Sequence, residues 1–255
     1  MKKYVSLFLV GLVLISFSSV SALDLKGKFA VSGNGGLGLP VGDFADEDKG
    51  AAKSGFGFGG NFEYFLTDNV SIGGNFTYWK HDVKTEGLGE GLKEIEESYP
   101  GAMVAVDIDG DHKITSFGAF GKYLFTASPQ VSPYLKFGLG MGKLKSVLDL
   151  SGSVFYEGEA IAWDASTDID VDFRAYVDMG GGILYQLSES IALTGEVLYT
   201  HLMTDGANGE MDMEITVSGM GQNIEEKEKG KREYGVDTDY ISAFVGLTIL
   251  LGGTR

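Results

Sequence analysis

Apolar and polar residues alternate along residues 55–80 of the chain. In residues 56–66 every even position except Gly60 is apolar, while the odd positions carry Gly, Asn, Glu and one Phe. A period of two is the signature of a β-strand with two different faces. The alternation resumes after a three-residue polar turn and predicts an antiparallel hairpin. Because the second face carries small polar residues, the pattern favours a membrane barrel whose apolar face is turned outward to lipid.

The same alternation recurs along the chain and predicts eight strands, the first of which breaks into a loop at Pro40. The predicted strands cover residues 29–39, 56–66, 70–80, 114–126, 134–144, 171–187, 191–200 and 240–251. Their connections alternate between long and short, as in up-and-down barrels with short periplasmic turns and long loops at the opposite rim. The predicted fold class is all-β: an eight-stranded antiparallel up-and-down transmembrane β-barrel with long extracellular loops.

Three long acidic segments join the predicted strands, at residues 81–112, 146–170 and 204–239. Parts of these segments alternate as well, which predicts hairpins that continue above the membrane. These parts are residues 103–108, 154–161 and 211–217. Residues 92–99 can form a short helix. The run EEKEKGKRE at residues 225–233 mixes charges of both signs and is predicted to be a solvated, mobile loop.

Aromatic residues gather near both predicted rims, as expected for girdles at the lipid headgroups. They are Tyr64, Phe65, Tyr123, Phe125, Tyr134 and Tyr185 toward the short turns, and Tyr78, Trp79, Phe173 and Tyr199 toward the long loops. The alternative is a soluble calycin-like barrel. Such a barrel would place bulky residues inside and polar residues outside, which is the reverse of this pattern.

The N-terminus has the features of a secretory signal. Lys2 and Lys3 precede an apolar run over residues 4–20, and Val20-Ser21-Ala22 supplies the small residues needed for cleavage. A retained membrane anchor is the alternative, because the run approaches spanning length. The predicted organisation is a cleaved signal peptide at residues 1–22 and one outer-membrane β-barrel domain at residues 23–255.

Composition narrows the candidate functions further. The formal net charge of −16 argues against nucleic acid as a partner, because a phosphate backbone needs a basic surface. The absence of cysteine excludes disulfides and thiolate metal sites. No later apolar run reaches the length of a spanning helix, so a membrane-spanning structure has to be built from strands.

Three stretches carry a family resemblance: GLGLPVGDFAD at residues 36–46, VSPYLKFGLGMG at residues 131–142 and YISAFVGLTILLGG at residues 240–253. With them the chain resembles the bacterial outer-membrane β-barrel superfamily of small eight-stranded proteins, which includes the OmpA transmembrane domain, OmpX and OmpW. The last strand departs from the family's assembly signal by ending in Leu251 and a GGTR tail in place of a terminal aromatic residue. The resemblance implies an outer-membrane location, a monomer, and lipid, lipopolysaccharide and the barrel assembly machinery as partners.

Seven ionisable residues are predicted to face the barrel interior. They are Lys28, Glu63, Lys122, Lys136, Arg174, Asp178 and Glu196. The interior of an eight-stranded barrel is just wide enough for side chains to fill, and buried charges persist only when they are paired. The first interpretation is a salt-bridge network that fills the lumen. The alternative is a polar conduit or gate, which the family resemblance permits.

The predicted loops carry two weaker signals. Asp107, Asp109 and Asp111 have the spacing of a calcium loop, but His112 and Gly118 stand where an EF-hand needs Gly and Glu. We therefore expect a solvated loop tip, with weak divalent-cation contacts as the alternative, and assign no metal site and no cofactor. His201 with Asp205 or Ser218 could form a catalytic group, but one sequence does not establish their geometry, so no catalytic residue is assigned.

Three classes of function follow from these patterns. The first, which the sequence favours, is a non-enzymatic structural or surface-interaction barrel with acidic loops outside and a largely side-chain-filled polar interior. The second is a narrow channel for small molecules, including hydrophobic ones, as the resemblance to OmpW implies. The third and weakest is an enzyme acting on lipid or peptide through loop residues.

Overall fold

The computed structural model describes residues 25–84, 103–125, 128, 130–156, 159–219 and 222–252. This part of the chain forms one antiparallel sheet of ten strands and one short 3-10 turn, η1 (Gly42–Phe44). The strands are β1 (Phe29–Val41), β2 (Ala52–Phe65), β3 (Val70–Val83), β4 (Met103–Leu124), β5 (Val131–Tyr156), β6 (Glu159–Ser188), β7 (Ile191–Leu202), β8 (Ala207–Gly219), β9 (Gln222–Tyr234) and β10 (Thr238–Leu251). Among the described residues, no helix is long and apolar enough to cross a membrane.

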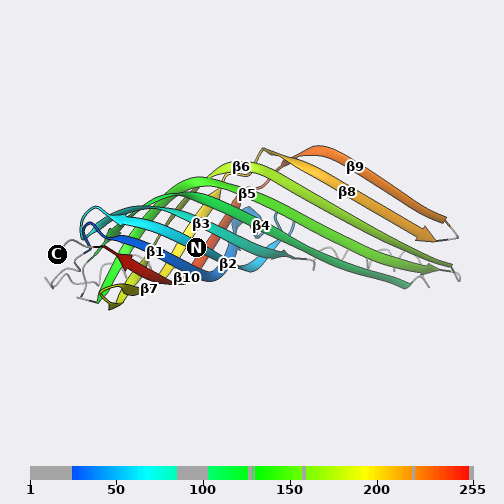
Figure 1. Ribbon diagram of the computed structural model, residues 1–255. Helices are drawn as coiled ribbons and strands as arrows, with labels where there is room; N and C mark the ends of the chain where they lie inside the picture. The colour runs from blue at the N-terminus through cyan, green and yellow to red at the C-terminus, as the bar shows by residue number, and fades with distance from the viewer. Residues whose placement is uncertain are drawn as a thin grey trace.

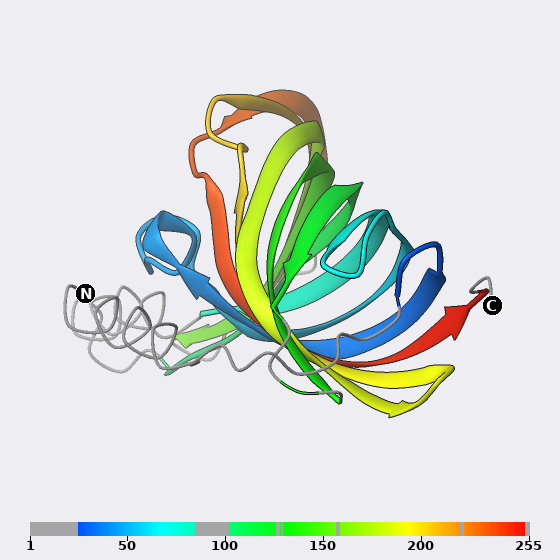
Figure 2. The same cartoon turned by 90° about the vertical axis from the view of Figure 1, so that its left-hand side faces the viewer.

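Eight of the strands close into a barrel. Neighbouring strands pair in the order β1 to β7, β10 follows β7, and β10 pairs with β1 along its length. Figure 2 looks at the barrel from the end that carries the short turns, and its strands wrap around a common axis. Every neighbouring pair is antiparallel, so the predicted eight-stranded up-and-down barrel is confirmed.

The alternation of the sequence becomes the two faces of the barrel wall. On β10 the odd positions point outward, with Val245 71% exposed, while the even positions from Tyr240 to Leu250 are all buried. On β1, Leu37 is 64% exposed and Ala30 is fully buried. Side chains of such size, exposed on every wall strand, are what a lipid-facing surface requires.

Three wall strands continue beyond the barrel as an extension. β4, β5 and β6 are longer than predicted and stay hydrogen-bonded to one another past the rim, where β8 pairs with the upper part of β6 and β9 with β8. These five strands form the surface sheet, which projects beyond one end of the barrel in Figure 1. Residues 103–108, 154–161 and 211–217, expected above the membrane, all contribute to it where they are described.

A β-bulge marks the point where β6 leaves the barrel. Gly142 pairs with Arg174 but Leu144 pairs with Val171, so two residues of β6 oppose one residue of β5. The bulge changes the inward-facing positions of β6 from even to odd residue numbers. Tyr176 is buried on the barrel side of the bulge, and Val171 is buried on the side of the surface sheet. Bulges bend strands at barrel rims, and this one turns the wall into the surface sheet.

Two predicted loops are strands. Residues 107–112, expected as a solvated loop tip, lie within β4, and residues 225–233, expected as a mobile loop, lie within β9. The charges of β9 alternate with the pleat, so Lys227 and Lys229 reach acids on β8 directly across the ladder. The loop predictions are wrong because a sheet outside the membrane can carry charged residues on its solvent face.

Three further predictions concern single segments of the chain. β1 runs through Pro40 to Val41 and does not break at the proline. The signal peptide at residues 1–22 and the helix at residues 92–99 lie outside the described residues.

Three aromatic residues assigned to the lipid girdles point inward instead. Phe65, Trp79 and Tyr134 are all buried, because each follows or precedes an outward residue on its strand. Phe65, Tyr134, Leu124 and Leu250 belong to an apolar cluster at the end with the short turns. Trp79 belongs to a second cluster, with Phe44 and Tyr240, at the opposite mouth. Apolar layers therefore lie at both ends of the lumen.

Candidate functional site

Two buried ion pairs cross the barrel interior between the apolar layers. Lys122 Nζ on β4 lies 2.8 Å from Glu63 Oε2 on β2, and Lys136 Nζ on β5 lies 2.9 Å from Glu196 Oε1 on β7. All four side chains are almost fully buried. Lys122 and Lys136 are directly opposite each other in the β4–β5 register, so the two pairs lie at one level of the barrel.

Neutral side chains complete the hydrogen bonding of this layer. Ser71 Oγ donates to Glu63, and Tyr134 Oη donates to Glu196 Oε2 over 2.9 Å. The ring of Phe120 lies within 5.1 Å of the ammonium nitrogens of both lysines. A cation over an aromatic face is further stabilised. The parity of the strands places Ser71, Phe120 and Tyr134 inside, but nothing in the sequence identifies them as partners of the charges.

The remaining three predicted interior charges lie apart from these pairs. Lys28 is partly exposed near the rim with the short turns, and Arg174 is partly exposed beside the β6 bulge. Asp178 is 4% exposed, and its Oδ1 accepts no hydrogen bond in the described structure. None of the three forms an ion pair with another described residue. The structure thus brings together four of the seven predicted residues.

A small polar cavity lies between the ion pairs and the aromatic residues of the mouth. Its wall includes Asp178, Asn34, Asn75 and Tyr176. Tyr176 Oη and the Asn75 side chain are joined by a hydrogen bond. The cavity has room for about one water molecule, which is the smallest volume that hydrates a buried polar site.

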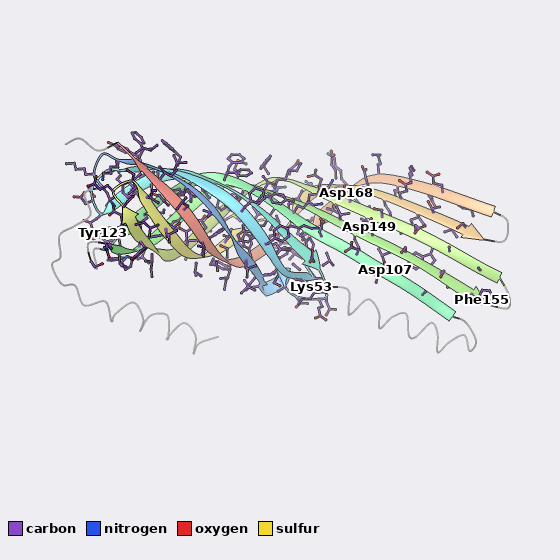
Figure 3. All side chains as sticks on the ribbon, turned by 60° about the horizontal axis from the view of Figure 1, so that its bottom comes forward. Lys53, Asp107, Tyr123, Asp149, Phe155 and Asp168 are labelled. Carbon is purple, nitrogen blue, oxygen red and sulfur yellow. The ribbon has the colours of Figure 1, made fainter. Side chains whose placement is uncertain are left out.

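A second group of polar residues covers the outer face of the surface sheet. Asp107 and Asp109 on β4, Asp149 on β5, and Asp164 on β6 line one shallow groove. Figure 3 shows Asp107 and Asp149 side by side on the extension. Asp109 and Asp149 are directly opposite each other in the β4–β5 register. None of these four acids forms an ion pair with a described residue.

Neighbouring acids on the same face of the surface sheet differ from these four, because they form ion pairs with lysines. Lys145 lies 2.5 Å from Asp168, and Lys143 lies 2.8 Å from Asp170. Lys227 and Lys229 neutralise Glu214 and Asp212 in the same way. No cluster of three or more His, Cys, Asp and Glu side chains in the described ranges has the geometry to hold a metal ion.

The histidine considered for catalysis has a different acid partner from the one expected. His201 Nδ1 lies 2.7 Å from Asp239 Oδ1, which also accepts a hydrogen bond from Tyr199. The Asp205 backbone N–H donates instead to Asp237. His201 and Asp239 are a cross-strand pair of β7 and β10, a common structural arrangement.

Comparison with protein families matches residues 10–223 to the outer membrane protein beta-barrel domain. The chain belongs to this family. It is therefore an outer-membrane protein whose wall strands cross the membrane. No curated protein matches the chain.

Several solved outer-membrane proteins resemble the chain in structure. Neisserial surface protein A is 14% identical, with 88% of this chain and 99% of that chain covered and a TM-score of 0.46. The attachment invasion locus protein Ail of Yersinia pestis is 14% identical, with 89% and 99% covered and a TM-score of 0.44. OprG of Pseudomonas aeruginosa is 16% identical, with 89% and 97% covered and a TM-score of 0.44.

Proposed function

We propose that this outer-membrane barrel is a non-enzymatic anchor that holds a sheet outside the cell for surface interaction. The observation that carries the proposal is the continuity of β4, β5 and β6, which pass from the lipid-facing wall into the surface sheet while remaining hydrogen-bonded. A sheet continuous with the wall is held in a fixed orientation to the membrane. Flexible loops alone would not hold it so.

The difference between the two faces of the surface sheet supports a role in binding for its outer face. The face continuous with the barrel lumen carries apolar residues such as Ile108, Leu150 and Trp163, all only partly exposed. The opposite face carries the groove of Asp107, Asp109, Asp149 and Asp164. The outer face is thus the polar side of a sheet whose other side is apolar.

The chemistry of this groove favours positively charged partners. Like charges directly opposite on neighbouring strands destabilise a sheet, and Asp109 faces Asp149 in this way. A cationic group from another molecule would relieve the repulsion. We propose that the groove attracts cationic groups of extracellular molecules and, weakly, divalent cations. Contacts of the wall with lipid, lipopolysaccharide and the assembly machinery, and a monomeric state, are part of the same proposal.

Charge neutralisation in the groove tests the proposed contact surface. We expect D107N/D109N/D149N/D164N to weaken binding of an oligolysine peptide to the vesicle-reconstituted protein several-fold at low salt, because the unpaired carboxylates supply the attraction. The matched control, D168N/D170N/D212N/E225Q, removes the same charge from acids outside the groove that already form ion pairs with lysines. Equal weakening by both variants would contradict a role for the groove and leave only the net charge.

The alternative function is a narrow channel. The polar cavity between the ion pairs and Tyr176 is the feature that favours it. The cavity holds about one water molecule, and the apolar layers at both mouths separate it from either side of the membrane. These layers support the anchor over the channel.

A further inference from the structure

Residues 42–53, which follow β1 and include the first two residues of β2, fold back over the barrel mouth. Its Phe44 is fully buried in the apolar cluster of the mouth. The Phe44 ring lies between two histidines, 5.7 Å from the ring of His81 and 5.2 Å from the ring of His112. We call residues 42–53 the latch.

Both histidines hold the latch by hydrogen bonds to its backbone. His112 Nε2–H donates to the carbonyl of Gly50 over 2.9 Å, and His81 Nδ1–H donates to the carbonyl of Lys53 over 3.0 Å. A carbonyl only accepts, so these bonds fix which ring nitrogen carries the proton in each neutral histidine. Ser146 Oγ, 2.6 Å from His112 Nδ1, then donates to the bare nitrogen.

The latch is a tight turn that is tied to the end of β3. Ala51 has a positive φ of 49°, which is costly for a residue with a side chain. The end of β3 holds this residue, because the Lys84 backbone N–H donates to the Ala51 carbonyl over 2.6 Å. Gly50 approaches the backbone of Phe44 so closely that a Cβ there would collide with it. Backbone hydrogen bonds within the latch, such as that from Gly50 N–H to the Asp43 carbonyl, shape the turn, and the bond to Lys84 ties it to the end of β3.

Burial of the two rings disfavours their charged forms. It holds the pKa of His112 at about 4, below its ordinary value of 6.5, and it also lowers the pKa of His81. Asp82 pulls the pKa of His81 upward and Asp111 that of His112, but burial outweighs both, and His81 further lowers the pKa of His112. Both histidines lie at the rim, outside the membrane-spanning part of β3 and β4.

The elements packed against the two rings carry further charged and titratable groups. They are Asp43, Asp46, Glu47 and Lys49 in the latch, Lys53 on β2, Lys80, Asp82 and Lys84 beside or on β3, Asp111 and Lys113 on β4, Lys145 on β5, and Asp239 and Tyr240 on β10. Lys80 and Lys113 are both paired with Asp111, and Lys49 with Asp43. The nearby lysines are thus largely engaged with acids of the same rim.

We propose that residues 42–53 are a pH-sensitive latch, closed over the barrel mouth by neutral His81 and His112 and released when these histidines take up protons. Release withdraws Phe44 and uncovers the aromatic layer of Trp79 and Tyr240. In the released state the histidines face water and titrate near their ordinary pKa. Docking therefore weakens as pH falls from about 6.5 toward 4, by roughly 100-fold at pH 4.5 from His112 alone.

Fluorine NMR of the reconstituted protein tests the latch. The chain has two tryptophans, Trp79 below the latch and Trp163 on the surface sheet, and 5-fluorotryptophan labels both. On acidification from pH 7.5 to pH 4 we expect the Trp79 resonance to shift and gain a solvent isotope effect, while Trp163 stays unchanged as the internal reference. A Trp79 resonance that does not respond, in a barrel whose far-UV circular dichroism is intact, would overturn the proposal.

Two variants identify the groups responsible. H81N and H112Q place an uncharged amide N–H close to each donating ring nitrogen, so the double variant should keep the latch closed at pH 4. H201Q is the control, because His201 bonds to Asp239 and donates none of the described hydrogen bonds to the latch, so its transition should match that of the unaltered chain. Persistence of the transition in H81N/H112Q would refute the role of the two histidines.

A second probe covers the case in which the double variant does not refold. Because the chain has no cysteine, Asp48→Cys accepts a single spin label on the exposed part of the latch. Its mobility should rise between pH 6.5 and pH 4 with the native histidines present. A label whose mobility is the same at both pH values would contradict release.

Discussion

Lys136→Met is expected to destabilise the folded barrel by about 3–5 kcal/mol, the cost of leaving one charge of a buried pair without its partner. Glu196 is 7% exposed and would keep only Tyr134 as a hydrogen-bond donor among its side-chain partners. The free energy of unfolding is measured by urea titration of the refolded protein in vesicles, with tryptophan fluorescence as the signal.

Two controls separate pairing from simple loss of a lysine. K136M/E196Q removes both charges and should recover most of the stability, since replacing a whole buried pair by neutral groups is often close to neutral. Lys227→Met removes a solvent-exposed pair partner on β9 and should leave the unfolding midpoint unchanged. A double variant as unstable as K136M would show that the lysine acts through packing and not through its charge.

Phe137→Arg and Val177→Arg are expected to cost about 2–4 kcal/mol each, because they place a charge on the lipid face near the membrane midplane. Phe137 is 52% exposed on the outer side of β5. Val177 lies on β6, two residues before Met179, which is the cross-strand partner of Phe137. The same urea titration measures the loss.

Ser166→Arg is the matched control for the lipid face. Ser166 is exposed on the surface sheet, where it donates a hydrogen bond to Asp149, so an arginine there stays in water beside acids. We expect little change in the free energy of unfolding. Equal losses at Phe137 and Ser166 would mean that the outer wall of β5 does not face lipid.

The sequence predicts the barrel wall well because lipid outside and packed side chains inside impose a strict alternation. Residues such as Phe137 and Val245 are large, apolar and spaced by two, and no soluble sheet needs that pattern on its outer face. The same parity identifies Glu63, Lys122, Lys136 and Glu196 as interior residues. This alternation does not predict which lysine pairs with which acid, because the pairing depends on how strands that are distant in the sequence close around the barrel.

The sequence is less informative outside the membrane. Residues 225–233 contact neither lipid nor a hydrophobic core, so their charge pattern predicts a loop, although Lys227 and Lys229 form ion pairs with acids on β8. Phe44 and His112 were missed as a unit for a related reason. They are far apart in the sequence, and only the fold brings the latch onto the paired ends of β3 and β4.

Single-channel recording in planar bilayers tests the closed barrel most directly. At pH 7, with the latch docked, the refolded protein is predicted to show no steady conductance, because the buried ion pairs lie between two apolar layers that close the lumen. Reproducible conductance steps from folded protein at this pH, altered by K136M/E196Q, would place an ion path through the interior and contradict the anchor.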